Sequence, residues 1–145
     1  MKRIVRLLIK TVPMKIIDSE LLIKLSEQAC NSPRLRMNHN LHASLEDKVQ
    51  RLLNAMEPGT ELPVHRHKDT DETYILLRGK LDVKVYNEQK ELIATHRLDP
   101  NEGKYGIHIP ANSWHNVEVL EKGTVIFEVK EGPYLPLSED DIMSF

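Results

Sequence analysis

The amino-acid sequence predicts a single, mainly β domain: an antiparallel barrel or jelly roll with a short helix near its N-terminus. At 145 residues the chain fits one domain with a substantial core. From residue 49 onward, short runs rich in Val, Ile and Leu recur, separated by Gly, Pro and Asn. Such runs are typical of the strands of a sandwich or barrel. One earlier stretch has its apolar residues at helical spacing.

That helix is predicted over residues 19–30. Asp18 or Ser19 can cap its first turn, and Pro33 stops it because proline disfavours helical geometry in the residue before it. Its apolar residues recur with the helical period: Leu21, Leu22, Leu25 and Ala29.

Residues 34–42 alternate between polar even positions and apolar odd positions, with His39 the exception, which predicts an extended segment. Its polar face carries Arg34, Arg36, Asn38, Asn40 and His42. Arginines bind carboxylates or phosphates through paired hydrogen bonds, and asparagines add neutral donors. At a barrel mouth this face would bind an anionic, sugar-derived ligand, with Arg34, Arg36 and Asn40 in contact with it. The alternative is a solvent-facing edge strand.

Further strands are predicted over residues 49–57, 72–78, 81–86, 92–97, 105–109, 114–120 and 124–130. For residues 44–57 a helix is the alternative, since their apolar positions also fit a helical stripe. Gly79 and Lys80, between two of the strands, predict a hairpin turn. The chain then divides into a leader (1–13), a helix with an extended segment (14–43), a β-barrel (44–132) and a C-terminal surface tail (133–145).

Composition narrows the function. A net charge of −2 and a pI near 6.4 offer no basic surface for nucleic acid. No apolar run approaches the roughly 18 residues that a membrane helix needs, so we expect no membrane association. Cys30 is the only cysteine, which excludes an internal disulfide and favours the cytoplasm; we expect its thiol to be packed. Residues 1–13 are basic, and we interpret them as an over-extended or dispensable leader rather than a signal peptide or membrane anchor.

The strongest chemical signal lies in residues 59–79. His65 and His67 are one residue apart, so on a strand both imidazoles face the same side. Glu72 on a neighbouring strand and His115 on a third can then complete a site of three nitrogens and one oxygen. Such ligands suit one divalent metal ion, for example Zn, Fe, Mn or Ni, and leave positions open for a substrate. A lone strand histidine is usually structural, but this spacing between two glycines is seldom accidental.

Three further residues are candidates for the same site. Tyr74 shares the parity of Glu72, so it should face the metal as an acid or hydrogen-bond donor, unless it only fills the barrel. His42 can titrate near neutral pH and shuttle protons. His108 is a candidate substrate-binding residue, although the turn that follows it leaves its direction open.

Residues 59–79 match, at every fixed position, the first motif of the cupin superfamily, G-x5-H-x-H-x4-E-x6-G. The second cupin motif is matched at Pro110 and His115, while Asn112 stands in place of a glycine and Val119 in place of an asparagine. Asn112 is a tolerable replacement, because asparagine enters left-handed backbone conformations readily.

From Met14 on, the chain also resembles the WbuC family of small single-domain cupins, through residues 32–42, 50–53 and 109–111 as well as the two motifs. This resemblance implies a cupin jelly roll and an association with surface-polysaccharide biosynthesis, without a firmly assigned reaction. It also implies a metal ion held by His65, His67, Glu72 and His115.

Three functions fit these observations. The favoured one is a metal-dependent enzyme for a small polar carbohydrate-derived or nucleotide-sugar substrate, such as an isomerase or epimerase, in which the metal acts as a Lewis acid. The others are an Fe(II)-dependent oxygenase and a non-catalytic sugar-binding or sensor module. Because small jelly rolls leave long edge strands that need covering, we also expect a homodimer.

Overall fold

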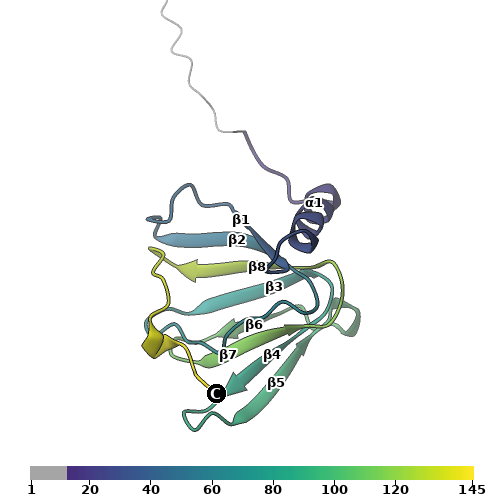
Figure 1. Ribbon diagram of the computed structural model, residues 1–145. Helices are drawn as coiled ribbons and strands as arrows, with labels where there is room; N and C mark the ends of the chain where they lie inside the picture. Colours follow the sequence, from purple (N-terminus) through teal and green to yellow (C-terminus); the bar gives the residue numbers. More distant parts are fainter. Residues whose placement is uncertain (1–12) are drawn as a thin grey trace, which may run out of the picture.

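The computed structural model describes residues 13–145, so the leader predicted over residues 1–13 lies outside this range except for Pro13. Within the described residues, eight strands form two antiparallel sheets that close over one another (Figure 1). The larger sheet has the order β1-β2-β8-β3-β6 and the smaller one β5-β4-β7. The strands are β1 (Arg36–Asn40), β2 (Val49–Met56), β3 (Glu72–Arg78), β4 (Leu81–Tyr86), β5 (Leu92–Leu98), β6 (Gly106–Ile109), β7 (Trp114–Val119) and β8 (Thr124–Glu131). The mainly β prediction is therefore confirmed, as is a strand rather than a helix over most of residues 49–57.

The predicted helix is α1 (Ser19–Cys30), and it lies against the outer side of the larger sheet (Figure 1). Asp18 caps it, since its carboxylate accepts a hydrogen bond of 3.0 Å from the Leu21 N–H. The helix packs on the sheet through a shared apolar cluster: Leu22, Leu25, Ala29, Leu53, Ala55 and Val125. Cys30 is exposed, contrary to the expected packed thiol, because it is turned by one helical step from the buried Ala29.

The inner face of the larger sheet changes from apolar to polar along its strands. Residues paired across antiparallel strands share a face, so register places Gln50, Lys130 and Glu72 in one inward row. The next inward row contains Asn40, Leu52, Glu128 and Tyr74. Beyond these rows Asn54 is the one buried polar side chain among the inward residues of β2, and the other inward residues are apolar: Met56, Leu76, Leu81, Val83, Val117, Val119 and Ile126. The fold therefore concentrates its inward polar groups at one end of the barrel.

Two local predictions were wrong. Strands β3 and β4 do not form a hairpin, because β3 pairs with β6 and β8 while β4 pairs with β5 and β7. Gly79 instead carries the chain from one sheet to the other. The extended segment begins at Arg36 and not at Arg34, because Leu35 adopts a left-handed conformation with φ of 55°. Arg34 therefore does not continue the polar face of β1.

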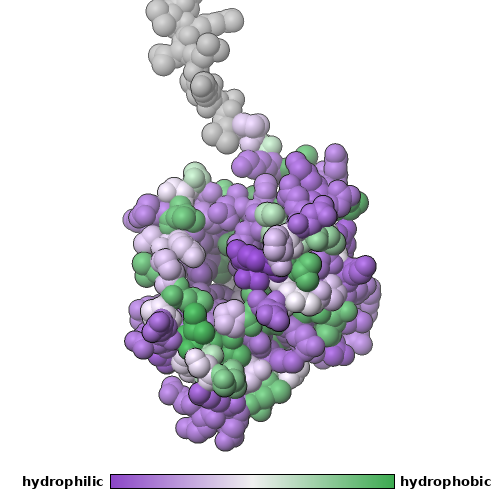
Figure 2. Space-filling view, in the orientation of Figure 1, coloured by the Kyte–Doolittle hydropathy of each residue, from purple (hydrophilic) through white to green (hydrophobic). Residues whose placement is uncertain are grey.

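The helix length and the surface hydropathy bear on membrane contact. No helix of residues 13–145 is long and apolar enough to cross a membrane. Figure 2 shows a largely hydrophilic face on which apolar side chains form small separate groups.

Replacing Gly79 with alanine should lower the free energy of unfolding by about 2–5 kcal/mol. Gly79 has φ of 98°, and an added Cβ would lie 2.6 Å from the Thr124 Cα, a backbone atom that cannot move aside. Gly103→Ala is the matched control: its φ is 74°, but no heavy atom lies within 4 Å of an added Cβ. It should therefore cost only roughly 1–2 kcal/mol. Equal losses in urea unfolding would contradict the crowding at Gly79.

Candidate metal centre

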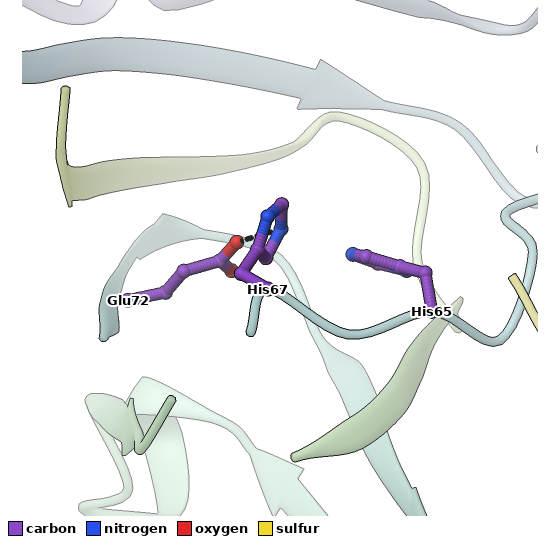
Figure 3. Close-up of side chains that lie close together, drawn as sticks. All are labelled: His65, His67 and Glu72. Atoms are coloured by element: carbon purple, nitrogen blue, oxygen red, sulfur yellow. Dashed lines mark ion pairs between the residues drawn. The ribbon is translucent and has the colours of Figure 1, made fainter. Parts of the chain in front are cut away.

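His65 and His67 lie in an extended loop between β2 and β3, not in a strand as the sequence predicted. Only His65 joins a ladder: it exchanges two backbone hydrogen bonds with His115, of 3.0 and 2.9 Å, and also bridges to Ile142. Pro63 has no N–H and cannot extend this pairing. The segment is nevertheless extended enough that both rings lie on the side of Glu72 (Figure 3).

The three side chains come together at the start of β3. Metal-ligating atoms of His65, His67 and Glu72 all lie within 4.8 Å of one another. His67 Nε2 forms an ion-pair contact with Glu72 Oε1, and His65 directs a ring nitrogen toward this pair (Figure 3). Glu72 is buried, with 6% of its surface exposed. This set can hold a divalent metal ion through two nitrogens and a carboxylate.

His115 on β7 lies beside this group. Its ring centroid is 4.5 Å from that of His65, and its Nε2 is 3.6 Å from Glu72 Oε2. Its Nδ1 donates to the Ser113 carbonyl at 2.8 Å, just as His65 Nδ1 donates to the Pro63 carbonyl at 2.9 Å. A carbonyl only accepts, so each Nδ1 carries the proton and each Nε2 keeps a free lone pair. Both histidines are thus fixed in the tautomer that a metal ligand needs.

Two buried atoms in the centre lack hydrogen-bond partners among the described residues: His115 Nε2 and Glu72 Oε2. Unsatisfied buried polar atoms are uncommon, and they often mark the site of an ion or ligand. A metal bound at Nε2 of His115 and at Glu72 would satisfy both. The donor set therefore fits a divalent metal.

Protonation is also suited to metal binding. Burial, together with the neighbouring His115, lowers the pKa of His65 to about 4, so this imidazole is neutral at physiological pH. Burial alone would raise the pKa of Glu72, but the adjacent His115 and His67 rings outweigh it and the pKa is lowered. The site therefore offers a carboxylate facing an uncharged His65.

Tyr74 faces this carboxylate from the next inward position of β3 and is 4% exposed. Burial, followed by the negative charges of Glu72 and Glu128, raises its pKa well above the ordinary value. Its hydroxyl is therefore a hydrogen-bond donor at neutral pH, not a base.

The C-terminal tail is hydrogen-bonded to the histidine loop. The Arg66 N–H donates to the Asp141 carbonyl at 3.0 Å, and the Met143 N–H donates to the Val64 carbonyl at 2.8 Å. The Arg66 guanidinium lies 3.4 Å from Asp141 Oδ1 and 4.5 Å from the centroid of Trp114. Sequence inspection missed this role, because a Pro-rich acidic tail gives no pairing signal. The tail fixes the backbone on both sides of His65.

Other predicted residues lie away from the centre. His108 is exposed on the outer face of β6, where Nδ1 lies 3.2 Å from the Thr73 hydroxyl. Arg36 donates to the Glu61 carbonyl at 3.0 Å and to Thr60 at 3.3 Å, so its guanidinium anchors the loop before the histidines. Arg34 is exposed before β1. The structure does not bring these three side chains together with the metal ligands.

Asn40 and His42 line a separate polar cavity under β1, β2 and β8. Three strand spacings, roughly 14 Å, separate β1 from β3, so His42 is too far for direct proton transfer at the metal. The same cavity contains two residues that sequence inspection missed, Glu128 and Lys130. Their parity on β8, which they share with the buried Ile126, could have indicated that they face inward. Burial and the charge of Glu72 raise the pKa of Glu128 to about 7.

Comparison with known structures identifies the fold. The cupin domain of Cnp3 from Schizosaccharomyces pombe aligns with a TM-score of 0.53 and 18% identity, over 66% of this chain and 64% of that one. A cupin superfamily protein from Desulfitobacterium hafniense aligns with a TM-score of 0.51 and 18% identity, over 66% of this chain and 76% of that one. The capsular polysaccharide assembling protein CapF from Staphylococcus aureus aligns at 0.53 and 20%, over 63% of this chain and 25% of that one. The chain thus spans less than two thirds of Cnp3's domain and a quarter of CapF. These similarities show a cupin fold.

Sequence comparison gives a family and no curated relative. A family model described as a domain of unknown function (DUF6016) matches residues 17–98. A search of curated proteins finds no match.

After metal removal, the protein should become less stable as the pH falls from 6.5 to 4. The pKa of His65 is about 4 in the folded state and about 6.5 unfolded, so the unfolded chain binds more protons in this window. The loss should reach up to about 3 kcal/mol in urea unfolding. His65→Asn should flatten the slope, whereas His96→Asn, at an exposed histidine, should not. An unchanged slope in His65→Asn would contradict the assignment.

Removing the Asp141 carboxylate should weaken metal binding without unfolding the protein. Asp141→Asn loses the charge that holds Arg66 and Lys68, and such outer contacts typically matter by about 10–100-fold in metal affinity. Asp140→Asn is the control, since Asp140 contacts Arg66 only through its carbonyl. Competition titration with a chelator measures the metal affinity of each variant. Equal affinities in the two variants would contradict a role for the tail.

Proposed function

The chain belongs to the DUF6016 family, a domain of unknown function, and we propose that it is a divalent-metal-binding cupin enzyme for a small, polar, carbohydrate-derived substrate. The observation that carries the proposal is the pair of unpartnered atoms, His115 Nε2 and Glu72 Oε2, beside a His65 in the matching tautomer. His65, His67, Glu72 and His115 would hold the metal. A bound metal would supply a Lewis acid that polarises a substrate oxygen.

The remaining chemistry would come from residues of this chain. Tyr74 would donate a hydrogen bond to a substrate oxygen beside Glu72, since its raised pKa keeps the proton on its hydroxyl. His42, Asn40 and the cavity that they line would hold the substrate. Arg34, Arg36 and His108, which the sequence suggested as substrate-binding residues, do not line this cavity, so they would contact only a part of the substrate that extends beyond it.

The proposal includes a biological setting. Resemblance to the WbuC family supports a role in surface-polysaccharide biosynthesis in the cytoplasm, and the partial likeness to CapF agrees with it. Among the described residues, no strand pairs with the outer edges of β1, β5 and β6, and these open edges support a homodimer.

An Fe(II)-dependent oxygenase is the second candidate. It is favoured by the compact group of His65, His67 and Glu72, because two histidines and one carboxylate bind Fe(II) in many oxygenases. Iron in the purified protein together with substrate-dependent O₂ consumption would favour this function. Zinc or manganese with isomerised product, analysed by mass spectrometry and NMR, would favour the first; tight binding without turnover would indicate a sensor.

The double substitution His65→Ala and His67→Ala should abolish stoichiometric metal binding, because it removes two of the ligands. Elemental analysis of the purified protein measures the metal content per chain. His96→Ala with His108→Ala is the matched control, since both residues are histidines exposed on the outer surface. Undiminished metal in the first double variant would refute the metal centre.

A further inference from the structure

A polar cavity of about 320 Å³ lies under β1, β2 and β8, next to the metal centre. Asn38, Asn40 and His42 line one side, and Glu128 and Lys130 line the other. Glu128 pairs across the sheet with Tyr74, and Lys130 pairs with Glu72. Neighbouring strands are about 4.8 Å apart, so the cavity begins one strand away from a metal ligand.

His42 presents an unsatisfied ring nitrogen to this cavity. The side chain is 6% exposed, and its Nδ1 lies 3.0 Å from both the N–H and the carbonyl oxygen of Arg51. His42 Nε2 is buried and has no partner among the described residues. A ligand hydroxyl, which can both donate and accept, would satisfy Nε2 in either tautomer of the ring.

The other groups favour hydroxyls as the partners. Asn38 and Asn40 each offer an amide donor and acceptor at the cavity wall, and a hydroxyl can both donate and accept. Tyr134 lies at the rim, 47% exposed, where its ring can cover the apolar face of a sugar. The volume is at the lower end of the roughly 300–1,000 Å³ typical of ligand pockets, which suits one monosaccharide and not a whole nucleotide sugar.

Lys130 lies between this cavity and the loop that carries the histidines. It lines this cavity and also a smaller one, of about 130 Å³, whose lining includes His67 but none of the other three proposed ligands. Among residues 13–145, no carboxylate lies within 4.0 Å of its ammonium group. The ammonium is therefore available to an anionic group of a ligand, on the side of the cavity where the metal ligands lie.

We propose that this cavity binds a sugar acid of monosaccharide size, with its hydroxyls on Asn38, Asn40 and His42 and its carboxylate on Lys130. The assignment rests on the proposed metal-dependent function, because the carboxylate end then faces the metal centre. It replaces the arginine-based anion site expected from the sequence, since Arg36 is engaged by the loop at residues 60–61.

Calorimetric titration of the metal-loaded protein tests the proposal, with D-glucuronate and D-galacturonate as sugar acids and D-glucose and D-galactose as their neutral counterparts. At least one acid should bind about tenfold or more tightly than its neutral counterpart. Lys130→Met should remove this preference and leave binding of the neutral sugar unchanged. Lys104→Met, at an exposed lysine outside the cavity, should change nothing. Asn40→Ala should weaken binding of the acid and of the neutral sugar by the same factor. The Asn40 side chain is exposed, so its removal should not disturb the core.

Metal content is measured on each sample, so that the two proposals fail separately. Full metal content with no binding of either acid, or equal binding of acid and neutral sugar, overturns the sugar-acid site and leaves the metal centre standing. An acid preference that survives Lys130→Met overturns the role of Lys130. Wild-type protein that takes up no divalent metal overturns the proposed function instead.

Discussion

The backbone pairing of His65 with His115 determines most of what this site can be. Two hydrogen bonds join the loop after β2 to β7, and they connect the larger sheet to the smaller one. The same pairing sets the two imidazoles side by side, with centroids 4.5 Å apart. Both rings then donate from Nδ1 to carbonyls two residues earlier in the chain. The same contacts that join the two sheets therefore also orient the two imidazole rings, and this preorganises the centre for a metal.

The second constraint is the polarity of the sheet interior. A cupin barrel buries the inner faces of both sheets, where an unpaired charge is costly. The inward charges, Glu72, Glu128 and Lys130, are grouped in two adjacent rows at one end of the larger sheet, and the rings of His67 and His115 lie against Glu72. Apart from Asn54, the buried inward residues of β2, β3 and β8 outside these rows and the strand ends are apolar. Stability and chemistry are therefore supplied by different ends of the same strands.

Local patterns predicted the fold well, and tertiary pairing explains where they failed. Alternation, helical spacing and glycine positions gave the helix and nearly every strand, because these signals depend on near neighbours. Asn112 adopts the left-handed conformation that made it a tolerable replacement for glycine, with φ of 66°. The pattern at Gly79 cannot show whether the flanking strands pair or separate into two sheets, since pairing depends on distant residues. The position of the tail could not be predicted for the same reason. Its hydrogen-bond partners are backbone groups of residues 64–66, and backbone groups are the same whatever the side chain.

The candidate site shows the same division between local and distant information. Motif spacing was enough to identify the four proposed ligands, His65, His67, Glu72 and His115. The directions of the His42 and His108 side chains could not be predicted in this way, because they depend on where β1 ends and on how β6 pairs with β3. Glu128 and Lys130 became relevant only through their cross-strand partners, Tyr74 and Glu72.

The two parts of the site are built differently, and this difference bears on how the protein could change its ligand. The metal ligands are oriented by backbone carbonyls and by a bridge between sheets, which few side-chain substitutions can alter. The cavity beside them is lined by side chains on edge strand β1, in the loop that follows it, on β2, on β8 and in the tail, all of them outside the histidine loop. Asn38 and Asn40 are already exposed, so their replacement leaves no void in the core. If the cavity binds sugar acids as proposed, related chains could keep the histidine motif and differ in their ligand through the residues of β1, β8 and the tail.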